Sequence, residues 1–336
     1  MKKLLFVDHD YHKKTKSSDF FRKILKKNFL LQDYWVDKKL NLDKKIYEYE
    51  NIFFWQIFPP LKILRKLKNK NITWAPMYDS PMYPTGYSWL LWIIVKFYNV
   101  KIITFSKAIT NQILNKKIRY IDLRYFEKSK KISYKKNKKI KILFWDRNEI
   151  KFKNWIDKFN LDHVEKIYYL KIENSKSVKF KDKEIQKKVL YINKKFSKNN
   201  NHFRNLIKKT DVFICPREKE GIGLAMIEAL SYGKYLIAKN DNTMSEYINN
   251  KKVGSFFNAN LSRNDIFRNI KKYSNYRTRY NTNGHNKYLK KEKKIVSFVS
   301  QKQNYLNKNL MFEFIIIFMY YFKIALRKVH LILKRI

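Results

Sequence analysis

The chain of 336 residues has little glycine, proline or cysteine. It contains 6 Gly, 6 Pro and 1 Cys. The single cysteine, Cys215, excludes a disulfide framework within the chain and a cysteine-based metal cluster, and it favours a reducing cytoplasm. Glycine lets the backbone approach a ligand closely. A local concentration of glycine is therefore informative in this sequence.

Long apolar runs are also lacking. The longest candidate, Phe314–Phe322, has nine residues, whereas a membrane-spanning helix needs about 20. Near the N-terminus, the apolar run Leu4–Val7 is followed by Asp8 and is too short for the apolar region of a secretion signal. We therefore expect no transmembrane helix.

Acidic residues are scarce. There are 28 Asp and Glu against 75 Lys and Arg, and the net charge is +47. This charge favours anionic partners, such as nucleic acid, phosphorylated ligands or anionic lipid. The lysines are spread along the whole chain, as the compositional bias of an AT-rich genome would produce. Both explanations stay open, but no motif of a nucleic-acid-binding module is present and we expect no nucleic-acid partner.

Short apolar runs alternate with amphipathic segments along most of the chain. This alternation predicts an α/β fold with parallel sheets that are covered by helices on both faces. The predicted strands are Lys3–Val7, Ile52–Phe58, Ile72–Ala75, Val100–Phe105, Ile140–Trp145, Val164–Leu170, Val189–Ile192, Val212–Pro216, Tyr235–Ala238 and Val253–Phe257. The predicted helices are Ser17–Lys27, Trp89–Tyr98, Ser106–Lys116, Asn201–Lys209, Ile222–Ser231 and Thr243–Ile248.

The elements fall into two Rossmann-like domains, residues 1–126 and 139–260, with a basic linker at 127–138 and a helical C-terminal region at 261–336. Two facing domains of this kind form a cleft, and ligands bind at the carboxyl ends of their strands.

Within the C-terminal region, residues 311–336 combine an aromatic and aliphatic run with Lys and Arg. This pattern fits an interfacial helix on an anionic membrane, and equally a helix that returns to cover the first domain.

The most informative segment is residues 211–248. Two acids, Glu220 and Glu228, stand eight positions apart, and Gly221 and Gly223 follow the first acid. The order is a strand, a glycine-bearing turn and a helix. Such a turn presents free backbone N–H groups to an anion such as a phosphate.

This segment resembles the signature of retaining glycosyltransferases of the GT-B fold, in particular family four. The resemblance rests on Pro216, the turn Glu220–Leu224, Glu228 and Gly233. It is close over this segment and weaker along most of the chain. Two prolines of the family pattern are absent: Lys234 and Tyr235 follow Gly233, and Ala225 follows Leu224.

The resemblance implies a nucleoside-diphosphate sugar as donor and requires no metal. Glu220 would accept hydrogen bonds from the donor sugar and Glu228 from the ribose hydroxyls, because an ionised carboxylate is purely an acceptor. Fixed cations would stabilise the charge that develops on the leaving nucleotide. Either acid alone could equally be an ordinary helix residue. The backbone donors would be Gly221, Ile222, Gly223 and Leu224, and the cations Arg147, Lys151 and Lys153, although Asp146 stands where the family has glycine before Arg147.

We expect the acceptor on the first domain, in the loops that follow its strands. The loop after the third strand holds Asp79, at a place where many relatives carry a histidine. Asp79 could act as general base if the reaction inverts, and it also suits a plain turn. The loop after the first strand holds His9, Asp10, His12, Thr15, Ser17 and Ser18.

The sequence therefore predicts a hexosyltransferase-like enzyme that moves a sugar from a nucleoside diphosphate to a hydroxyl of a bacterial surface glycan or lipid-linked acceptor, with retention implied by the resemblance. It would act in the cytoplasm, at the inner face of the cytoplasmic membrane. The alternatives are a GT-B sugar-nucleotide epimerase and a basic nucleic-acid-binding protein. Neither a P-loop nor a dinucleotide-binding fingerprint is present.

Overall fold

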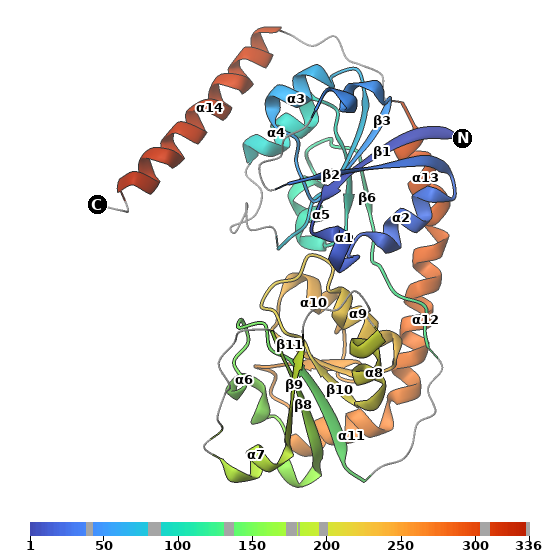
Figure 1. The fold of residues 1–336 in the computed structure, drawn as a ribbon, viewed down its shortest axis with the longest axis vertical. Helices are drawn as coiled ribbons and strands as arrows, with labels where there is room; N and C mark the ends of the chain where they lie inside the picture. The colour runs from blue at the N-terminus through green and yellow to red at the C-terminus, as the bar shows by residue number, and fades with distance from the viewer. Residues whose placement is uncertain are drawn as a thin grey trace. The chain divides into compact units, whose positions relative to one another are not determined.

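The computed structural model describes residues 1–37, 43–79, 89–130, 138–172, 180, 182–194, 201–302 and 310–333. The chain forms two compact units (Figure 1). Unit 1 comprises Met1–Leu123 and Lys291–Ile336, and unit 2 comprises Arg124–Lys290. Each unit contains a six-stranded sheet. The predicted α/β fold with two Rossmann-like sheets and C-terminal helices is confirmed, while the predicted domain boundaries stay a prediction.

The sheet of unit 1 has the strand order β2-β1-β3-β4-β5-β6, and its described pairs are parallel. Its inner strands are buried on both faces and therefore read as continuous apolar runs. The edge strands β2 and β6 are half-exposed, and the sequence pattern does not reveal them. The strands are β1 (Lys2–His9), β2 (Phe29–Val36), β3 (Asn51–Trp55), β4 (Asn71–Ala75), β5 (Lys101–Thr104) and β6 (Tyr120–Asp122).

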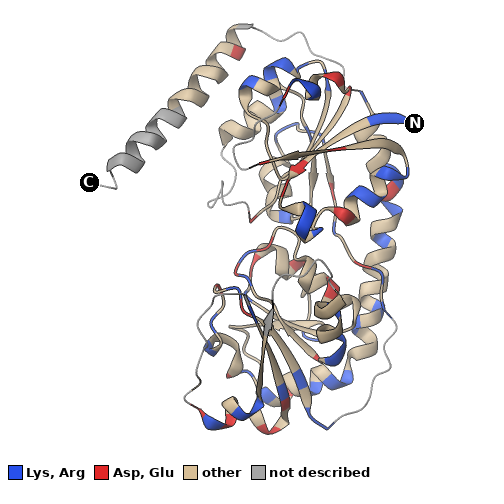
Figure 2. Ribbon diagram, viewed as in Figure 1, with Lys and Arg blue, Asp and Glu red and all other residues tan. Residues whose placement is uncertain are grey.

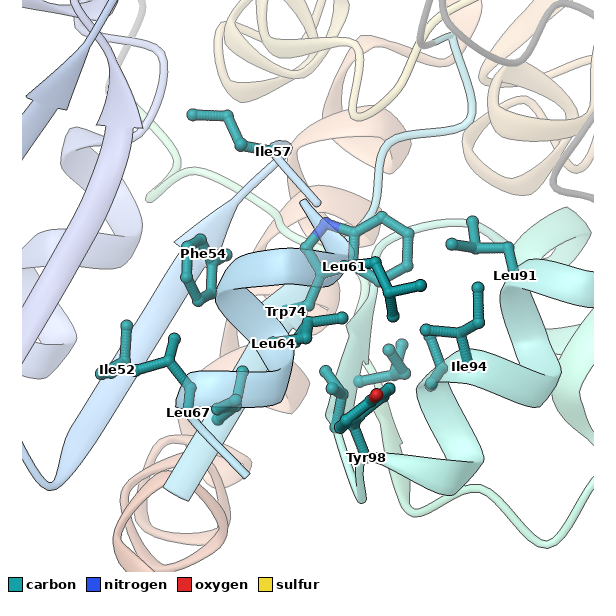
Figure 3. Packing of buried hydrophobic residues seen from close by; sticks show 14 of the residues in the cluster. Ile52, Phe54, Ile57, Leu61, Leu64, Leu67, Trp74, Leu91, Ile94 and Tyr98 are labelled. Atoms are coloured by element: carbon teal, nitrogen blue, oxygen red, sulfur yellow. The ribbon is translucent and has the colours of Figure 1, made fainter. Parts of the chain in front are cut away.

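One face of this sheet carries an extended apolar cluster (Figure 3). Leu61 and Leu64 of α3 pack toward Trp74 of β4, and Leu91 and Ile94 of α4 close the cluster from the side. Each of these five side chains is buried. The helices of this part are α1 (His12–Thr15), α2 (Asp19–Lys26), α3 (Leu61–Lys66), α4 (Trp89–Phe97) and α5 (Lys107–Ile113), with a 3₁₀ turn at Lys44–Glu48.

The chain returns to unit 1 through α13 (Glu292–Ser300). The end of α13 is held by Lys101, a fully buried residue of β5. Its amino group donates to the carbonyl oxygens of Val299 at 3.1 Å and Gln301 at 3.0 Å, and also to that of Phe298. Burial lowers the pKa of Lys101 to about 7. Carbonyl groups at a helix end have no partner within the helix, so Lys101 satisfies them.

Replacing Lys101 with methionine should destabilise unit 1, because Lys101→Met keeps the apolar stem and leaves buried carbonyl oxygens without a donor. We expect the free energy of unfolding to fall by about 2–4 kcal/mol, measured by chemical denaturation. Lys96→Met, at an exposed position of α4, is the control and should change it by less than about 0.5 kcal/mol. Equal stability of both variants would contradict this role of Lys101.

Helix α14 (Leu310–Leu333) also belongs to unit 1. On its inner side Ile316 is buried in the apolar cluster, and the Glu313 carboxylate accepts a hydrogen bond from Tyr98 Oη at 2.9 Å. Its opposite side exposes Met311, Phe314, Ile315, Phe318, Tyr321 and Phe322. We call these six residues the α14 apolar face. No helix in the described part of the chain is long and apolar enough to span a membrane.

The sheet of unit 2 has the strand order β12-β11-β10-β7-β8-β9, so the order reverses between β10 and β7. Ligands of open parallel sheets bind outside the carboxyl ends of the strands at such a reversal. The strands are β7 (Ile140–Trp145), β8 (Val164–Ile172), β9 (Val189–Lys194), β10 (Val212–Ile214), β11 (Tyr235–Ala238) and β12 (Gly254–Phe256). The helices are α6 (Lys153–Ile156), α7 (Lys183–Lys188), α8 (Asn201–Lys209), α9 (Leu224–Ser231), α10 (Asn242–Tyr247), α11 (Arg263–Lys272) and α12 (Ser274–Lys290).

Candidate active site

The loops that follow β7 and β10 lie against each other at the reversal point of unit 2. The two strands are parallel neighbours, with Ile214 beside Phe144, so both loops leave the same edge of the sheet. Arg217 Nε donates to Glu149 Oε1 at 3.0 Å. The backbone N–H of Glu218 donates to the other carboxylate oxygen of Glu149 at 3.1 Å. These contacts join the two loops into one structure.

Glu220 extends this ion-pair chain. Its Oε2 lies 3.7 Å from Arg217 Nη1, and its side chain is only 15% exposed. Arg217 therefore stands between the carboxylates of Glu149 and Glu220. Arg217 cannot be singled out along the sequence, because a single arginine carries no signal in a chain with 75 Lys and Arg.

The turn from Gly221 to Leu224 leads directly into α9. Gly223 occupies the N-cap position with φ 77° and ψ 43°, in the left-handed region, and no side chain of the described residues caps the helix there. A Cβ atom on Gly223 would lie 3.0 Å from Met226 Cε. The glycine thus permits a turn that leaves the first N–H groups of α9 available to an anion.

Replacing Gly223 with alanine should strain this turn, because a left-handed conformation costs a non-glycine residue about 1–2 kcal/mol. We expect the free energy of unfolding of Gly223→Ala to fall by that amount in urea denaturation. Lys209→Ala, at an exposed position of α8, serves as control and should change it by less than about 0.5 kcal/mol. A Gly223→Ala variant as stable as the control would show that the turn does not require glycine.

Glu228 lies in the middle of α9 and is largely buried, with its side chain 13% exposed. Burial raises the pKa of Glu228, and its hydrogen bond with Arg204 counteracts the rise. Arg204 of α8 donates through Nε to Glu228 Oε1 at 2.6 Å. Among the described residues, Oε2 of Glu228 has no hydrogen-bond partner. Arg204 comes from a neighbouring helix, and the sequence motif alone does not reveal this pairing.

The three cations expected after β7 differ in their surroundings. Arg147 is partly exposed and lies over the Trp145 ring, with its guanidinium carbon 5.0 Å from the ring centroid. Lys151 and Lys153 are exposed. Asp146, which replaces the family's glycine, accepts hydrogen bonds from the backbone N–H of Asn148 at 2.8 Å and from Tyr169 Oη at 2.6 Å. The aspartate therefore builds the turn that carries Arg147.

A third loop, after β11, reaches the same edge of the sheet. Burial raises the pKa of the Asp241 carboxyl, and the backbone N–H groups of Asn242, Thr243 and Glu220 counteract the rise. Asp241 is thus close to the backbone of Glu220. Thr243 is fully buried, and its Oγ1 has no hydrogen-bond partner among the described residues. Neither residue was selected from the sequence.

Asp79 belongs to unit 1, where it follows β4 and is partly exposed. The residues after it, 80–88, lie outside the described part of the chain. No group of three or more His, Cys, Asp or Glu side chains among the described residues is suited to hold a metal ion.

These features define a GT-B glycosyltransferase: two Rossmann-like sheets, and an acid-bearing glycine turn at the reversal point of the second. The sequence profile described as Glycosyl transferases group 1 matches residues 126–295, slightly more than half of the chain. The chain belongs to this family. It is therefore an enzyme, a glycosyltransferase, as the resemblance implied.

Several solved structures share the fold at low sequence identity. A glycosyltransferase from Rickettsia africae ESF-5 is 15% identical, with 90% of this chain and 99% of that chain covered and a TM-score of 0.57. Anabaena Alr3699/HepE in complex with UDP is 11% identical, with 89% and 99% covered and a TM-score of 0.56. The lipopolysaccharide outer core galactosyltransferase WaaB is 14% identical, with 90% and 100% covered and a TM-score of 0.54.

A curated protein of Plasmodium falciparum (isolate 3D7), described as a histone-lysine N-methyltransferase, is 35% identical over 118 residues. The alignment covers 32% of this chain and 2% of that protein. A match to so small a part of a long protein supports no statement about fold or activity.

Proposed function

We propose that unit 2 binds a nucleoside-diphosphate sugar at the carboxyl ends of β7, β10 and β11. Glu220 would bind the sugar hydroxyls and Glu228 the ribose hydroxyls. The diphosphate would lie on the turn Gly221–Leu224, with Arg147 as its cation and Lys151 and Lys153 as exposed supplementary charges. The observation that carries this proposal is the uncapped start of α9 beside the joined loops of Glu149 and Arg217.

The proposed division of roles follows from the surroundings of the two acids. Arg217 contacts Glu220 and orients its carboxylate, and an ionised carboxylate can accept several hydrogen bonds at once, including those of sugar hydroxyls. Glu228 keeps its Oε2 for a ribose hydroxyl while Arg204 neutralises its buried charge. The helix start and Arg147 would stabilise the negative charge that develops on the departing diphosphate. The UDP bound to Anabaena HepE supports UDP as the first nucleotide to test.

Two isosteric variants separate these roles. We expect Glu228→Gln to weaken UDP and UDP-sugar binding alike by about tenfold, because a charge-assisted hydrogen bond is lost. Glu220→Gln should leave UDP affinity unchanged and weaken only the sugar nucleotide. Calorimetric titration with UDP, UDP-glucose, UDP-galactose and UDP-N-acetylglucosamine measures both effects.

The matched control for this titration is Glu218→Gln, an exposed acid two positions from Glu220, which should bind like the wild type. Donor binding that survives the combined Glu220→Gln and Glu228→Gln changes would disprove the assignment of the donor site.

For the acceptor, we propose a hydroxyl of a bacterial surface glycan or of a lipid-linked sugar, bound by unit 1, with transfer that retains the anomeric configuration. The fold similarity to a lipopolysaccharide outer core galactosyltransferase supports this class of acceptor. Asp79, at the carboxyl end of β4, would serve as general base if transfer inverts the configuration. Product analysis by NMR decides between retention and inversion.

We further propose that the protein acts in the cytoplasm, on the inner face of the cytoplasmic membrane, and that the α14 apolar face rests on anionic lipid. Phe314 and Phe318 are 68% and 70% exposed, and the Phe318 ring stacks on the ring of Phe322 one turn further along the helix. Aromatic side chains on one face of a basic helix suit the lipid interface. The sequence adds Lys323, Arg327, Lys328, Lys334 and Arg335.

Removing two aromatic side chains from this face should reduce lipid binding. We expect Phe314→Ser combined with Phe318→Ser to lose most of its flotation with vesicles that contain phosphatidylglycerol, because their apolar area drives insertion. Leu114→Ser, at the exposed C-cap position of α5, is the control and should float like the wild type. Full flotation of the double variant would rule out α14 as the lipid-binding element.

A further inference from the structure

The strand order also reverses in the sheet of unit 1, between β1 and β3. Strand β1 pairs with β2 on one side and with β3 on the other side. The carboxyl ends of β1 and β3 therefore mark the position where a ligand of this sheet would bind. The loops after the two strands meet there, because Tyr11 Oη donates to Gln56 Oε1 at 3.1 Å.

A buried polar network fixes the base of this position. Asp8, fully buried, contacts His12 Nδ1 at 2.5 Å and accepts from Ser18 Oγ at 2.6 Å and from Arg22 Nη2 at 2.8 Å. The backbone N–H of His9 donates to Asp8 Oδ1 at 2.7 Å. Both carboxylate oxygens thus have partners. A fully satisfied buried network of this kind is rigid.

The network supports a partly exposed layer of aromatic and polar groups. The His12 ring meets the Tyr11 ring edge-on, with centroids 4.2 Å apart, and the His9 ring stacks on Tyr11 at 5.1 Å. Tyr11 is 47% exposed. The ring nitrogens of His9 form no hydrogen bond with the described residues. Burial and the neighbouring His12 lower the pKa of His9, so its imidazole is neutral near pH 7 and offers one donor and one acceptor.

Gln56 completes this layer in an unusual conformation. Its φ is 63°, in the left-handed region, which residues other than glycine seldom adopt. Strained backbone of this kind tends to occur at binding sites. The Gln56 carbonyl oxygen is held by Trp74 Nε1 at 3.3 Å, and its side-chain oxygen by Tyr11, so the amide NH₂ remains as a donor.

We propose that His9, Tyr11 and Gln56 form a binding site in unit 1 for the hydroxyl-rich ring of a neutral pyranoside. The exposed Tyr11 ring would cover the apolar face of the sugar, while the His9 imidazole and the Gln56 amide would bind its hydroxyl groups. None of these three side chains is a cation at neutral pH, which favours an uncharged sugar over a phosphate. This inference rests on the proposed function, in which the sugar bound here is the acceptor substrate.

The test uses the full chain with ¹⁵N-labelled histidine side chains, titrated with the methyl pyranosides of glucose, galactose, mannose and N-acetylglucosamine. We expect at least one sugar to shift the imidazole resonances of His9 saturably, while those of His163 and His285 in unit 2 stay in place. The His9→Asn variant identifies the His9 resonances by their loss. No shift with any of the four sugars, or an equal shift of all histidines, would overturn the proposal.

Two variants test the individual groups, with the affinity read from the resonances that remain. His9→Asn and Tyr11→Leu should each weaken the binding of that sugar about fivefold or more, the effect of losing roughly one hydrogen bond or ring contact. His202→Asn, an exposed residue of α8, should bind as the wild type does. Sugar affinity unchanged in both variants would overturn the assignment.

UDP affinity is measured in the same samples and separates the two proposals. It should be unaltered by His9→Asn and Tyr11→Leu, because both residues lie in unit 1. If the wild type binds UDP but none of the sugars, the pyranoside site of unit 1 is rejected and the proposed donor site of unit 2 is not. Absence of UDP binding in the wild type rejects the proposed donor site and leaves the sugar titration interpretable.

Discussion

The contact of Arg217 with Glu149 is the interaction on which the candidate site depends. Parallel strands bring the loops after β7 and β10 to one edge of the sheet, but they do not set the distance between the loops. Arg217 joins the two loops through its 3.0 Å hydrogen bond to Glu149, and within its own loop it lies 3.7 Å from Glu220. This hydrogen bond is charge-assisted, and such bonds are stronger than bonds between neutral groups. The carboxylate of Glu220 is thereby held beside the open start of α9.

Some of the many Lys and Arg side chains are buried and stabilise the fold, while the others lie on the surface. Buried cations pair with carbonyl oxygens at the ends of helices and strands: Lys101 with three, and Arg277 of α12 with those of Gly233, Lys252, Asn269 and Ile270. Lys234, the residue after Gly233, donates to the carbonyl of Thr210. The remaining Lys and Arg are distributed over both units (Figure 2). Such a distribution is expected of compositional bias more than of one nucleic-acid surface.

Much of the fold could be predicted because its inner strands are apolar on both faces, as in β3 and β11. The edge strand β2 was not predicted, because its half-exposed positions weaken the apolar pattern of a buried strand. Helix α3 was not predicted, because six residues are too few to show helical periodicity. In the site, the spacing of Glu220 and Glu228 was visible along the sequence. Their partners Arg217 and Arg204 were not, because tertiary packing and not spacing selects them from many cations.

Hydrogen exchange with and without UDP, followed by mass spectrometry, tests directly whether the β7–β10 edge of unit 2 binds the nucleotide. UDP should slow exchange in peptides spanning residues 145–151 and 217–228. Peptides of β8 and of unit 1 should exchange as before. Protection confined to other segments, or no protection at UDP concentrations that saturate binding, would show that this edge is not the nucleotide site.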